Sequence, residues 1–472
     1  MRKDKRQQKN SEGEQLTLFN MRNLEPAGSL TEVISKGDGS GVELSSRLER
    51  QRTLTEHLLE KIVDDGNLNK AFKQVKENDG SSGIDEMEVD QLREWLGKHL
   101  KELREALLTE KYSVNAVRKV EIPKATGGIR ILGIPTVKDR FVQQAIDQEL
   151  NRYYDPYFSD NSYGFRPGRS THQAIIQATR YIKEGNEWVV DIDLEKFFDK
   201  INHDRLMQRL SKGIGDKRVL RLINAFLKTG IMEGGLMKQR TAGTPQGSPL
   251  SPLLSNIVLD ELDRELEKRG HKFCRFADDC NIYVKSRKAG ERVMASIVDF
   301  IEKKMKLKVN RNKSGVRHCS DVKFLGYTLL PEGGIRVADK SIDRFKGRIK
   351  EITKRNRGQK IEQIIKELNS AIIGWANYFY LADKWLAEIR DLDGWIRRKL
   401  RCYRLKQLGR KYTIVKFLMN HNIPANTSWN VVKYSQGWWH MSQKPAVGKA
   451  MNLVWFSRLG LQSIEISMTG KR

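Results

Sequence analysis

The chain has 472 residues, of which 39% are hydrophobic and 31% charged, a composition that excludes a disordered protein and indicates globular domains. Lysine and arginine outnumber aspartate and glutamate by 86 to 59, and the resulting net charge of +27 indicates a polyanionic partner, because each phosphate that they neutralise releases condensed counterions. No apolar run reaches the roughly 18 residues of a membrane-spanning helix, so we expect no transmembrane segment.

The N-terminal part divides into a polar leader and a helical extension. Residues 1–45 are polar and aperiodic, which predicts a disordered tail, and the basic start lacks the apolar segment of a secretory signal. From Leu48 the apolar residues follow the helical period, which predicts a helical extension over 46–110. At Ala116 the period changes, and AVRKVEIPK, TGG and IRILGIP predict a strand, a turn and a return strand.

The central part alternates predicted helices and strands. The helix VKDRFVQQAIDQELNRYY precedes the loop SDNSYGFRPGRS and a further helix. WVVDIDLEKFF is apolar on both sides of two aspartates and suits a buried strand. Two more helices, a hairpin over 231–242, the loop AGTPQGSPLSP and the helix LLSNIVLDELDRELEKRG then lead to the predicted hairpin KFCRFADDCNIYV.

The C-terminal part is helical in pattern and strongly basic. Residues 340–472 carry 27 Lys and Arg against 9 Asp and Glu, and seven of the nine tryptophans. Basic residues interleaved with aromatic ones suit nucleic-acid binding. The alternative is that Trp375, Trp385 and Trp395 are core residues of packed helices; we favour it for most tryptophans, with the cations binding from the opposite face. Beyond about residue 410 we expect a mixture of strands and helices.

Two adjacent aspartates, Asp278 and Asp279, lie between the apolar runs of the last hairpin. Aspartates at a hairpin turn are often simply exposed, but the apolar flanks favour burial here, and a buried carboxylate pair needs a cation such as Mg²⁺. Asp191 and Asp193 share one face of the other strand. One of them beside the pair would give three carboxylates, which can hold two metals ~3.5–4 Å apart and so favour a nucleotidyl transferase.

The four cysteines, Cys274, Cys280, Cys319 and Cys402, form no CxxC pair and have no zinc-ligand spacing. We therefore predict reduced thiols in a cytoplasmic protein.

These blocks resemble a known family. FADD resembles the [YF]xDD box of reverse transcriptases, and the order of EIPKATGGIRILGIPT, SYGFRPGRS, VVDIDLEKFFDKINHD, GTPQGSPLSPLLSNIVLDELD, LKVNRNKS and FLGYTL is similar to that family. The resemblance is to group II intron-encoded reverse transcriptase/maturases, in particular the compact bacterial kind associated with class C introns, and it covers about residues 60–400.

The resemblance implies an α+β right-hand polymerase followed by a helical thumb. It implies fingers and a palm with an antiparallel sheet over 111–335, and a thumb or maturase X domain over 336–408. We expect a small basic nucleic-acid-binding region over 409–472. The tail lacks the paired cysteines and the HNH-type histidine cluster of the endonuclease found in some relatives, so we expect no DNA-cleaving domain.

The resemblance also implies the metal ligands. In this family the first carboxylate stands five residues before an aromatic that screens the sugar 2′-position, which implies Asp193 as a ligand and Phe198 as the sugar gate. Asp278 and Asp279 complete the catalytic set, and Leu194 lends a backbone carbonyl. Asp191 is a fallback ligand, although we favour a polar strand residue bonded to backbone. Asp199 could equally be a structural, N-cap-like residue.

The implied contacts to the incoming dNTP come from several blocks. Lys124 and Arg130 flank the TGG turn and would hold the triphosphate, although a solvated surface hairpin is an even alternative without the other blocks. Gln246 would face nucleotide and template, with Gly243 and Gly247 allowing close backbone approach. Lys313 matches a motif near the leaving pyrophosphate.

Two sets of basic residues are implied to bind nucleic acid. Arg166 either contacts the template strand or ties the fingers together. The segment WIRRKLR resembles the thumb and supplies four cations: Arg397, Arg398, Lys399 and Arg401. Phe276 replaces the tyrosine that is usual in the YADD box, removing a hydroxyl while keeping both carboxylates.

The predicted function is an RNA-directed DNA polymerase of a mobile group II intron that uses two Mg²⁺ ions, with Mn²⁺ as a substitute. Its expected partners are intron RNA, an RNA template with a DNA primer, target DNA and dNTPs, with no membrane. Two alternatives stay open: an intron-independent, domesticated or defence-linked reverse transcriptase, and a splicing-only RNA-binding maturase.

Overall fold

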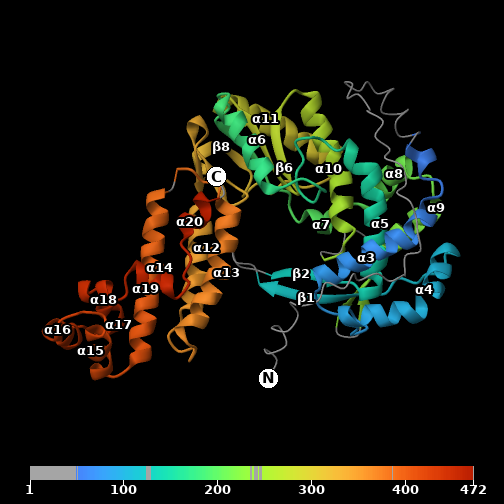
Figure 1. The fold of residues 1–472 in the computed structure, drawn as a ribbon. Helices are drawn as coiled ribbons and strands as arrows, with labels where there is room; N and C mark the ends of the chain where they lie inside the picture. The colour runs from blue at the N-terminus through green and yellow to red at the C-terminus, as the bar shows by residue number, and fades with distance from the viewer. Residues whose placement is uncertain are drawn as a thin grey trace. The chain divides into compact units, whose positions relative to one another are not determined.

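The computed structural model in Figure 1 describes residues 49, 51–123, 129–233, 236–238, 243, 247–384 and 386–470. The predicted tail over 1–45 lies outside these residues. The chain forms two compact units. Unit 1 takes the described residues up to Ser170 with Ile192–Cys280 and Met294–Gly315, and unit 2 takes Thr171–Asp191, Asn281–Val293 and the described residues from Val316.

Unit 1 begins with the predicted helical extension. It comprises α2 (Leu58–Ile62), α3 (Asp65–Asn78), the 3₁₀ turn η1 (Val89–Gln91) and α4 (Leu92–Leu108). Helix α3 lies beside α5 (Val137–Tyr154), as Figure 1 shows, and buries Leu68, Phe72 and Val75 at helical spacing. The Asn67 side chain donates a hydrogen bond to the Ala145 carbonyl at 2.9 Å, which fixes the register of the two helices.

The predicted β-hairpin after Ala116 is confirmed. Strands β1 (Val117–Pro123) and β2 (Ile129–Ile134) pair antiparallel with Ile122 opposite Arg130. Strand β4 (Ile231–Glu233) runs parallel to β1 and forms the second predicted hairpin with β5 (Leu236–Lys238), which gives the order β2-β1-β4-β5.

A second sheet carries the strands with the aspartates. Its order is β6 (Lys272–Phe276), β7 (Asp279–Val284), β3 (Trp188–Ile192) and β8 (Gly315–His318). The remaining elements of this part are η2 (Asp155–Tyr157), α6 (Thr171–Lys183), α7 (Phe197–Lys200), α8 (His203–Gly213), α9 (Lys217–Lys228), α10 (Ser251–Lys268), α11 (Arg287–Asp299) and the π-helical turn η3 (Phe300–Lys304).

Unit 2 continues with a small sheet and three long helices. The sheet order is β11 (Ile335–Val337), β10 (Tyr327–Leu329) and β9 (Lys323–Phe324), with the 3₁₀ turns η4 (Cys319–Asp321) and η5 (Pro331–Gly333). Helices α12 (Asp339–Ile352), α13 (Ile361–Phe379) and α14 (Leu386–Leu408) follow, in orange in Figure 1. Trp375 is half-buried and stacks on Phe345 with ring centroids 4.7 Å apart, so it packs between helices as we favoured, whereas Trp385 lies outside the described residues.

The expectation of strands beyond residue 410 is wrong for the residues that the structure describes there. They form α15 (Lys411–Met419), α16 (Ala425–Lys433), α17 (Gly437–Met441), α18 (Pro445–Ala450), α19 (Leu453–Arg458) and α20 (Ile464–Thr469). Helix α15 buries Ile414, Val415 and Leu418, a helical spacing that outweighs the strand propensity of its β-branched and aromatic residues.

The predicted α+β class is confirmed, with antiparallel hairpins in the sheets and a helical C-terminal region. Within the described residues, no helix combines the length and the apolar character needed to cross a membrane. All four cysteines are buried and none forms a disulfide.

Candidate active site

The two adjacent aspartates lie at a tight turn between β6 and β7, as predicted. Ala277 and Asp278 form the turn and Asp279 begins β7. The flanking Phe273 and Ile282 are fully buried, but Asp278 is half-buried and Asp279 is exposed. The expectation of a buried pair is therefore wrong for Asp279: the apolar runs fill the sheet while the turn itself reaches solvent.

Asp193 directly follows β3, the strand next to β7 in the sheet. Its carboxylate is partly exposed and accepts a charge-assisted hydrogen bond from the Lys313 ammonium, with Oδ2 and Nζ 3.2 Å apart. Its backbone is also held, because its N–H donates to Ser314 Oγ at 2.9 Å and its carbonyl accepts from the Asn310 N–H at 2.8 Å. The carboxylate and the predicted pyrophosphate lysine are thus neighbours.

Leu194 forms an isolated antiparallel bridge with Val309. The hydrogen bonds of this bridge use the carbonyl of Asp193 and the N–H of Glu195, which donates to the Lys308 carbonyl at 2.8 Å. The Leu194 carbonyl is outside this ladder, as its predicted role as a metal ligand requires.

Asp191, the fallback ligand, accepts a hydrogen bond from Arg317 at 3.0 Å. This ion pair gives Asp191 a structural partner, but the partner is the Arg317 side chain and not the backbone that we favoured. Asp199 is exposed and lies inside the short helix α7, whose N-cap residue is Lys196, so Asp199 is not an N-cap.

Phe198 lies on α7 with a half-buried ring, edge-on to the buried Phe197 at 5.5 Å. Gly243 explains how the GTPQG segment approaches helix α7. Its φ is 85°, and a Cβ there would lie 2.7 Å from the Phe198 carbonyl oxygen and 2.8 Å from Asp199 Cα. Only glycine allows this contact, so the loop that carries Gln246 begins directly against the predicted sugar gate.

Lys124 and Gln246 themselves lie outside the described residues, as does the side chain of Arg130. Their immediate neighbours are placed. A Cβ on Gly247 would lie 3.3 Å from the carbonyl of Gly133 in β2, the strand that also carries Arg130. Gly247 of the loop therefore lies close to the backbone of β2 at Gly133.

Arg166 is buried and faces the protein. Its guanidinium pairs with Asp155 at 2.7 Å and donates to the carbonyls of Ser159 and Ser162 at 2.6 and 2.9 Å. This arrangement supports the second role considered for Arg166, that of tying its loop together.

Three of the four predicted basic residues on α14 pack on aromatic rings. The Arg398 guanidinium carbon lies 3.7 Å from the Trp439 centroid, and Lys399 Nζ lies 4.8 Å from it. Arg401 stacks on Phe456 at 5.7 Å. Arg397 is half-buried on the same helix. These cations hold α17 and α19 against α14 with their π-contacts, a role that the sequence did not reveal.

One residue of the site was missed altogether. Arg275, in the strand that leads into FADD, is fully buried and forms a 2.6 Å ion pair with Asp263. The signal was present, because an arginine between Phe273 and Phe276 in an otherwise apolar strand needs a buried partner.

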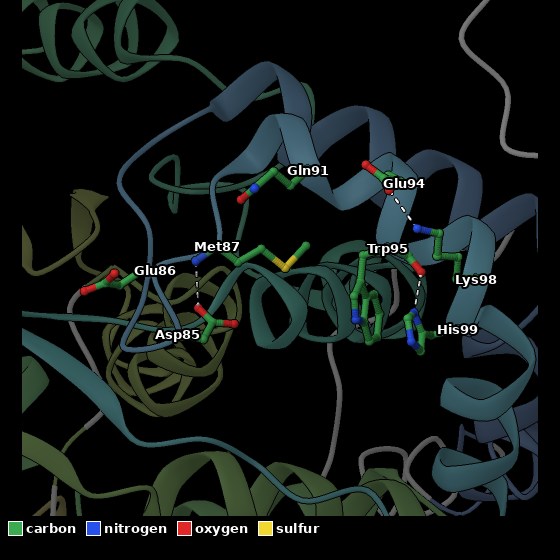
Figure 2. Close-up of a pocket in the computed structure, with 8 residues that line it drawn as sticks. All are labelled: Asp85, Glu86, Met87, Gln91, Glu94, Trp95, Lys98 and His99. Carbon is green, nitrogen blue, oxygen red and sulfur yellow. Dashed lines mark hydrogen bonds and ion pairs between the residues drawn. The ribbon is translucent and has the colours of Figure 1, made fainter.

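A surface pocket of about 420 Å³ lies elsewhere in unit 1, on the helical extension (Figure 2). Trp95 and His99 stack there, and Glu94 pairs with Lys98 at 2.8 Å. None of the predicted site residues lines this pocket, and its carboxylates, Asp85, Glu86 and Glu94, would repel a triphosphate.

Among the residues that the structure describes, no three His, Cys, Asp or Glu side chains lie close enough to hold one metal ion. Strand β3, which Asp193 follows, and strand β7, which begins with Asp279, are neighbours in the sheet. Asp193 already accepts a cation, the Lys313 ammonium, at a partly exposed position, so its oxygens fit a hard divalent ion.

Two family models match the chain. "Reverse transcriptase (RNA-dependent DNA polymerase)" matches residues 122–329, and "Group II intron, maturase-specific domain" matches residues 342–419. Together they cover the sheet that carries the aspartates and most of the three long helices.

Three curated relatives extend this similarity. Protein YkfC of Escherichia coli (strain K12) is 33% identical over 52% of this chain and 75% of YkfC. Group II intron-encoded protein LtrA of Lactococcus lactis subsp. cremoris is 28% identical, over 70% of this chain and 63% of LtrA. Putative COX1/OXI3 intron 2 protein of Saccharomyces cerevisiae is 29% identical, over 66% of this chain and 43% of that protein. The chain thus spans less than two thirds of two of these relatives.

Proposed function

This chain belongs to the group II intron reverse transcriptase/maturase family, and we propose that it copies RNA into DNA at the carboxylates of Asp193, Asp278 and Asp279. The observation that carries this site is the neighbouring pair of strands β3 and β7. One is followed directly by Asp193, and the other begins with Asp279 next to the turn residue Asp278.

A reverse transcriptase domain implies a divalent metal requirement in general. We propose two Mg²⁺ ions, replaceable by Mn²⁺, with the three carboxylates and the Leu194 carbonyl as ligands. When bound, such ions activate the primer 3′-hydroxyl and neutralise charge on the leaving pyrophosphate. The carboxylates would hold these ions, and the Lys313 ammonium, 3.2 Å from Asp193 Oδ2, would bind the departing phosphates once a metal ion takes its place at Asp193.

The dNTP is proposed to lie between the fingers hairpin and α7. Phe198 would exclude a 2′-hydroxyl, while Lys124 and Arg130 would bind the triphosphate and Gln246 the base pair. Supporting this, Gly243 packs on the carbonyl of Phe198, and Gly247 approaches the carbonyl of Gly133. The two glycines bracket the segment with Gln246.

The two matched domains imply binding of intron RNA and of nucleic-acid substrates. The finer proposal is that the protein assists splicing of its own intron and then takes part in retrohoming to target DNA. The net charge of +18 over residues 340–472 supports a phosphate-binding surface in this part of the chain. A cytoplasmic, nucleoid-associated location stays a prediction.

A primer-extension assay tests the polymerase site. Purified protein would be given a DNA primer annealed to an RNA template, four dNTPs and Mg²⁺. We expect Asp193→Asn and Asp278→Asn each to lower extension at least about 10³-fold, since each removes a ligand that nothing else replaces. Asp191→Asn is the matched control and should extend normally. Full-length cDNA from the Asp278→Asn protein would contradict the site.

A splicing role independent of polymerisation is supported by the maturase-domain match at residues 342–419. Asp278→Asn protein should therefore still bind the intron RNA encoded around its reading frame and promote its splicing. Equal affinity for that intron and for an unrelated RNA of the same length would instead favour an intron-independent reverse transcriptase.

A further inference from the structure

Arg275 on β6 is a fully buried arginine next to the Asp278–Asp279 turn. Its side chain has no exposed surface, and it stands two residues before the Ala277–Asp278 turn. Burying a guanidinium costs several kcal/mol unless its charge and its N–H groups are all satisfied. The partners of those groups therefore show what the residue holds in place.

Arg275 has five N–H donors, and the structure gives each of them an acceptor. Nε and Nη2 donate to the two carboxylate oxygens of Asp263 at 2.7 and 2.6 Å. Nη2 also donates to Ser162 Oγ at 2.7 Å, and Nη1 donates to Asn256 Oδ1 at 3.0 Å and to the Ala277 carbonyl at 2.9 Å. Four donors thus anchor the guanidinium, and the fifth reaches the turn.

The hydrogen bond to Ala277 acts on the acid pair through the backbone. The Ala277 carbonyl and the Asp278 N–H belong to one planar peptide group, so fixing the carbonyl also fixes the plane from which the Asp278 side chain departs. Ala277 has φ 57°, a left-handed conformation that is unfavourable for alanine and needs support from its surroundings.

A second contact holds the turn from the other side. A Cβ on Gly164 would lie 2.3 Å from the Ala277 nitrogen, so the backbone of the SYGF loop touches the turn directly. The Asn256 side chain, which accepts from Arg275, donates to the Gly164 carbonyl at 2.9 Å. One network therefore joins the loop, α10 and the turn.

We propose that Arg275 is a positioning residue for the polymerase centre, whose buried guanidinium sets the orientation of the Asp278–Asp279 turn for metal binding. This assignment rests on the proposed function. Stability alone does not account for the arginine, because buried ion pairs can often be exchanged for apolar residues without loss of stability. Lysine offers no planar fork and cannot serve five acceptors from one position.

The test is the double variant Arg275→Leu/Asp263→Leu, which removes both buried charges together. Mn²⁺ binding would be measured by electron paramagnetic resonance, and only the binding sites that are lost in the Asp278→Asn variant would be counted. Thermal unfolding and the Mg²⁺ dependence of primer extension would be measured on the same proteins. We expect native-like unfolding, about tenfold or more weaker Mn²⁺ binding, and a raised Mg²⁺ requirement, as for other residues that orient metal ligands.

The matched control is Arg218→Leu/Asp216→Leu, an ion pair of 2.9 Å at the start of α9. It should leave Mn²⁺ affinity unchanged. Wild-type Mn²⁺ affinity in the folded Arg275→Leu/Asp263→Leu protein would overturn the proposal. If that double variant does not fold, the Arg275→Lys variant tests the proposal, because lysine keeps the positive charge opposite Asp263 but lacks the planar guanidinium. Weaker Mn²⁺ binding by Arg275→Lys would support the proposal, and unchanged Mn²⁺ binding would overturn it.

Failure of the proposed function would look different. In that case the wild-type protein would extend no primer. If only the Arg275 assignment is wrong, the wild-type protein still extends the primer, and the Arg275→Leu/Asp263→Leu protein binds Mn²⁺ as tightly as wild type.

Discussion

Strand β6, which leads into the Asp278–Asp279 turn, and helix α14 both carry cations that are buried or half-buried, but the two elements stabilise these cations in different ways. Arg275 donates all its N–H groups to oxygen acceptors. Arg398 and Lys399 instead lie on the ring of Trp439. A hydrogen-bonded fork fixes position and direction, whereas a π-contact uses the face of a guanidinium and supplies no acceptor for its N–H groups.

The pKa values of the two sets differ accordingly. Burial acts to lower the pKa of Arg275, but the charge and hydrogen bonds of Asp263 outweigh it, and the pKa is raised. For Arg398, Lys399 and Arg401, burial lowers the pKa and no carboxylate reverses the shift. The charge of Arg275 is neutralised within the protein by Asp263, whereas the charges of the three α14 cations are not balanced by a carboxylate and suit a polyanionic partner.

The largest effect expected at the acid turn is on activity rather than on stability. Asp278→Ala should lower primer extension at least about 10³-fold, because a metal ligand is removed. The carboxylate is half-buried at a turn, so the free energy of unfolding in urea should change by less than about 1 kcal/mol. A large loss of stability would mean that Asp278 is part of the buried network and not of the site.

Arg275→Leu alone should destabilise the protein by about 3–5 kcal/mol, because it leaves the Asp263 carboxylate buried without its partner. Urea unfolding measures this change. The Asp263→Leu/Arg275→Leu double variant should recover most of the loss. Equal destabilisation by single and double variants would show that lost packing, not unpaired charge, dominates.

Gly164→Ala tests the contact between the SYGF loop and the turn. The added Cβ would lie 2.3 Å from the Ala277 nitrogen, so backbone must move, at a cost of about 1–3 kcal/mol. We expect lower thermal stability and reduced primer extension together. Gly97→Ala, on the exposed face of α4 with no atom near its added Cβ, is the control and should be neutral or stabilising.

Trp439→Leu addresses the second region and should have the smallest effect. Loss of the ring beneath Arg398 and Lys399 removes about 0.5–2 kcal/mol, mainly from the packing of α17 on α14. Amide hydrogen exchange should speed up in α17 while primer extension on a short template stays normal. A loss of polymerase activity would contradict the separation of the two regions.

Much of the site follows from local patterns. The hairpin around Asp278 and the strand before Asp193 are visible as apolar runs of strand length, and glycines in GTPQG mark a close backbone approach that Gly243 makes. Other predictions were wrong because local sequence patterns are ambiguous. The C-terminal segments hold β-branched and aromatic residues, yet their burial follows a helical period. Asp279 is exposed because the apolar flanks fill the sheet below the turn.

The sequence by itself determined the charge that calls for a nucleic acid, the order of the blocks, and the strands that carry the aspartates. These depend on composition and on contacts between near neighbours in the chain. Only the tertiary structure decided which groups surround Arg275, since its partners Asp263, Asn256 and Ser162 stand 12, 19 and 113 residues away. The same holds for Trp439 beneath Arg398, because a cation in a sequence does not reveal whether a carboxylate, a ring or water will face it once the chain has folded.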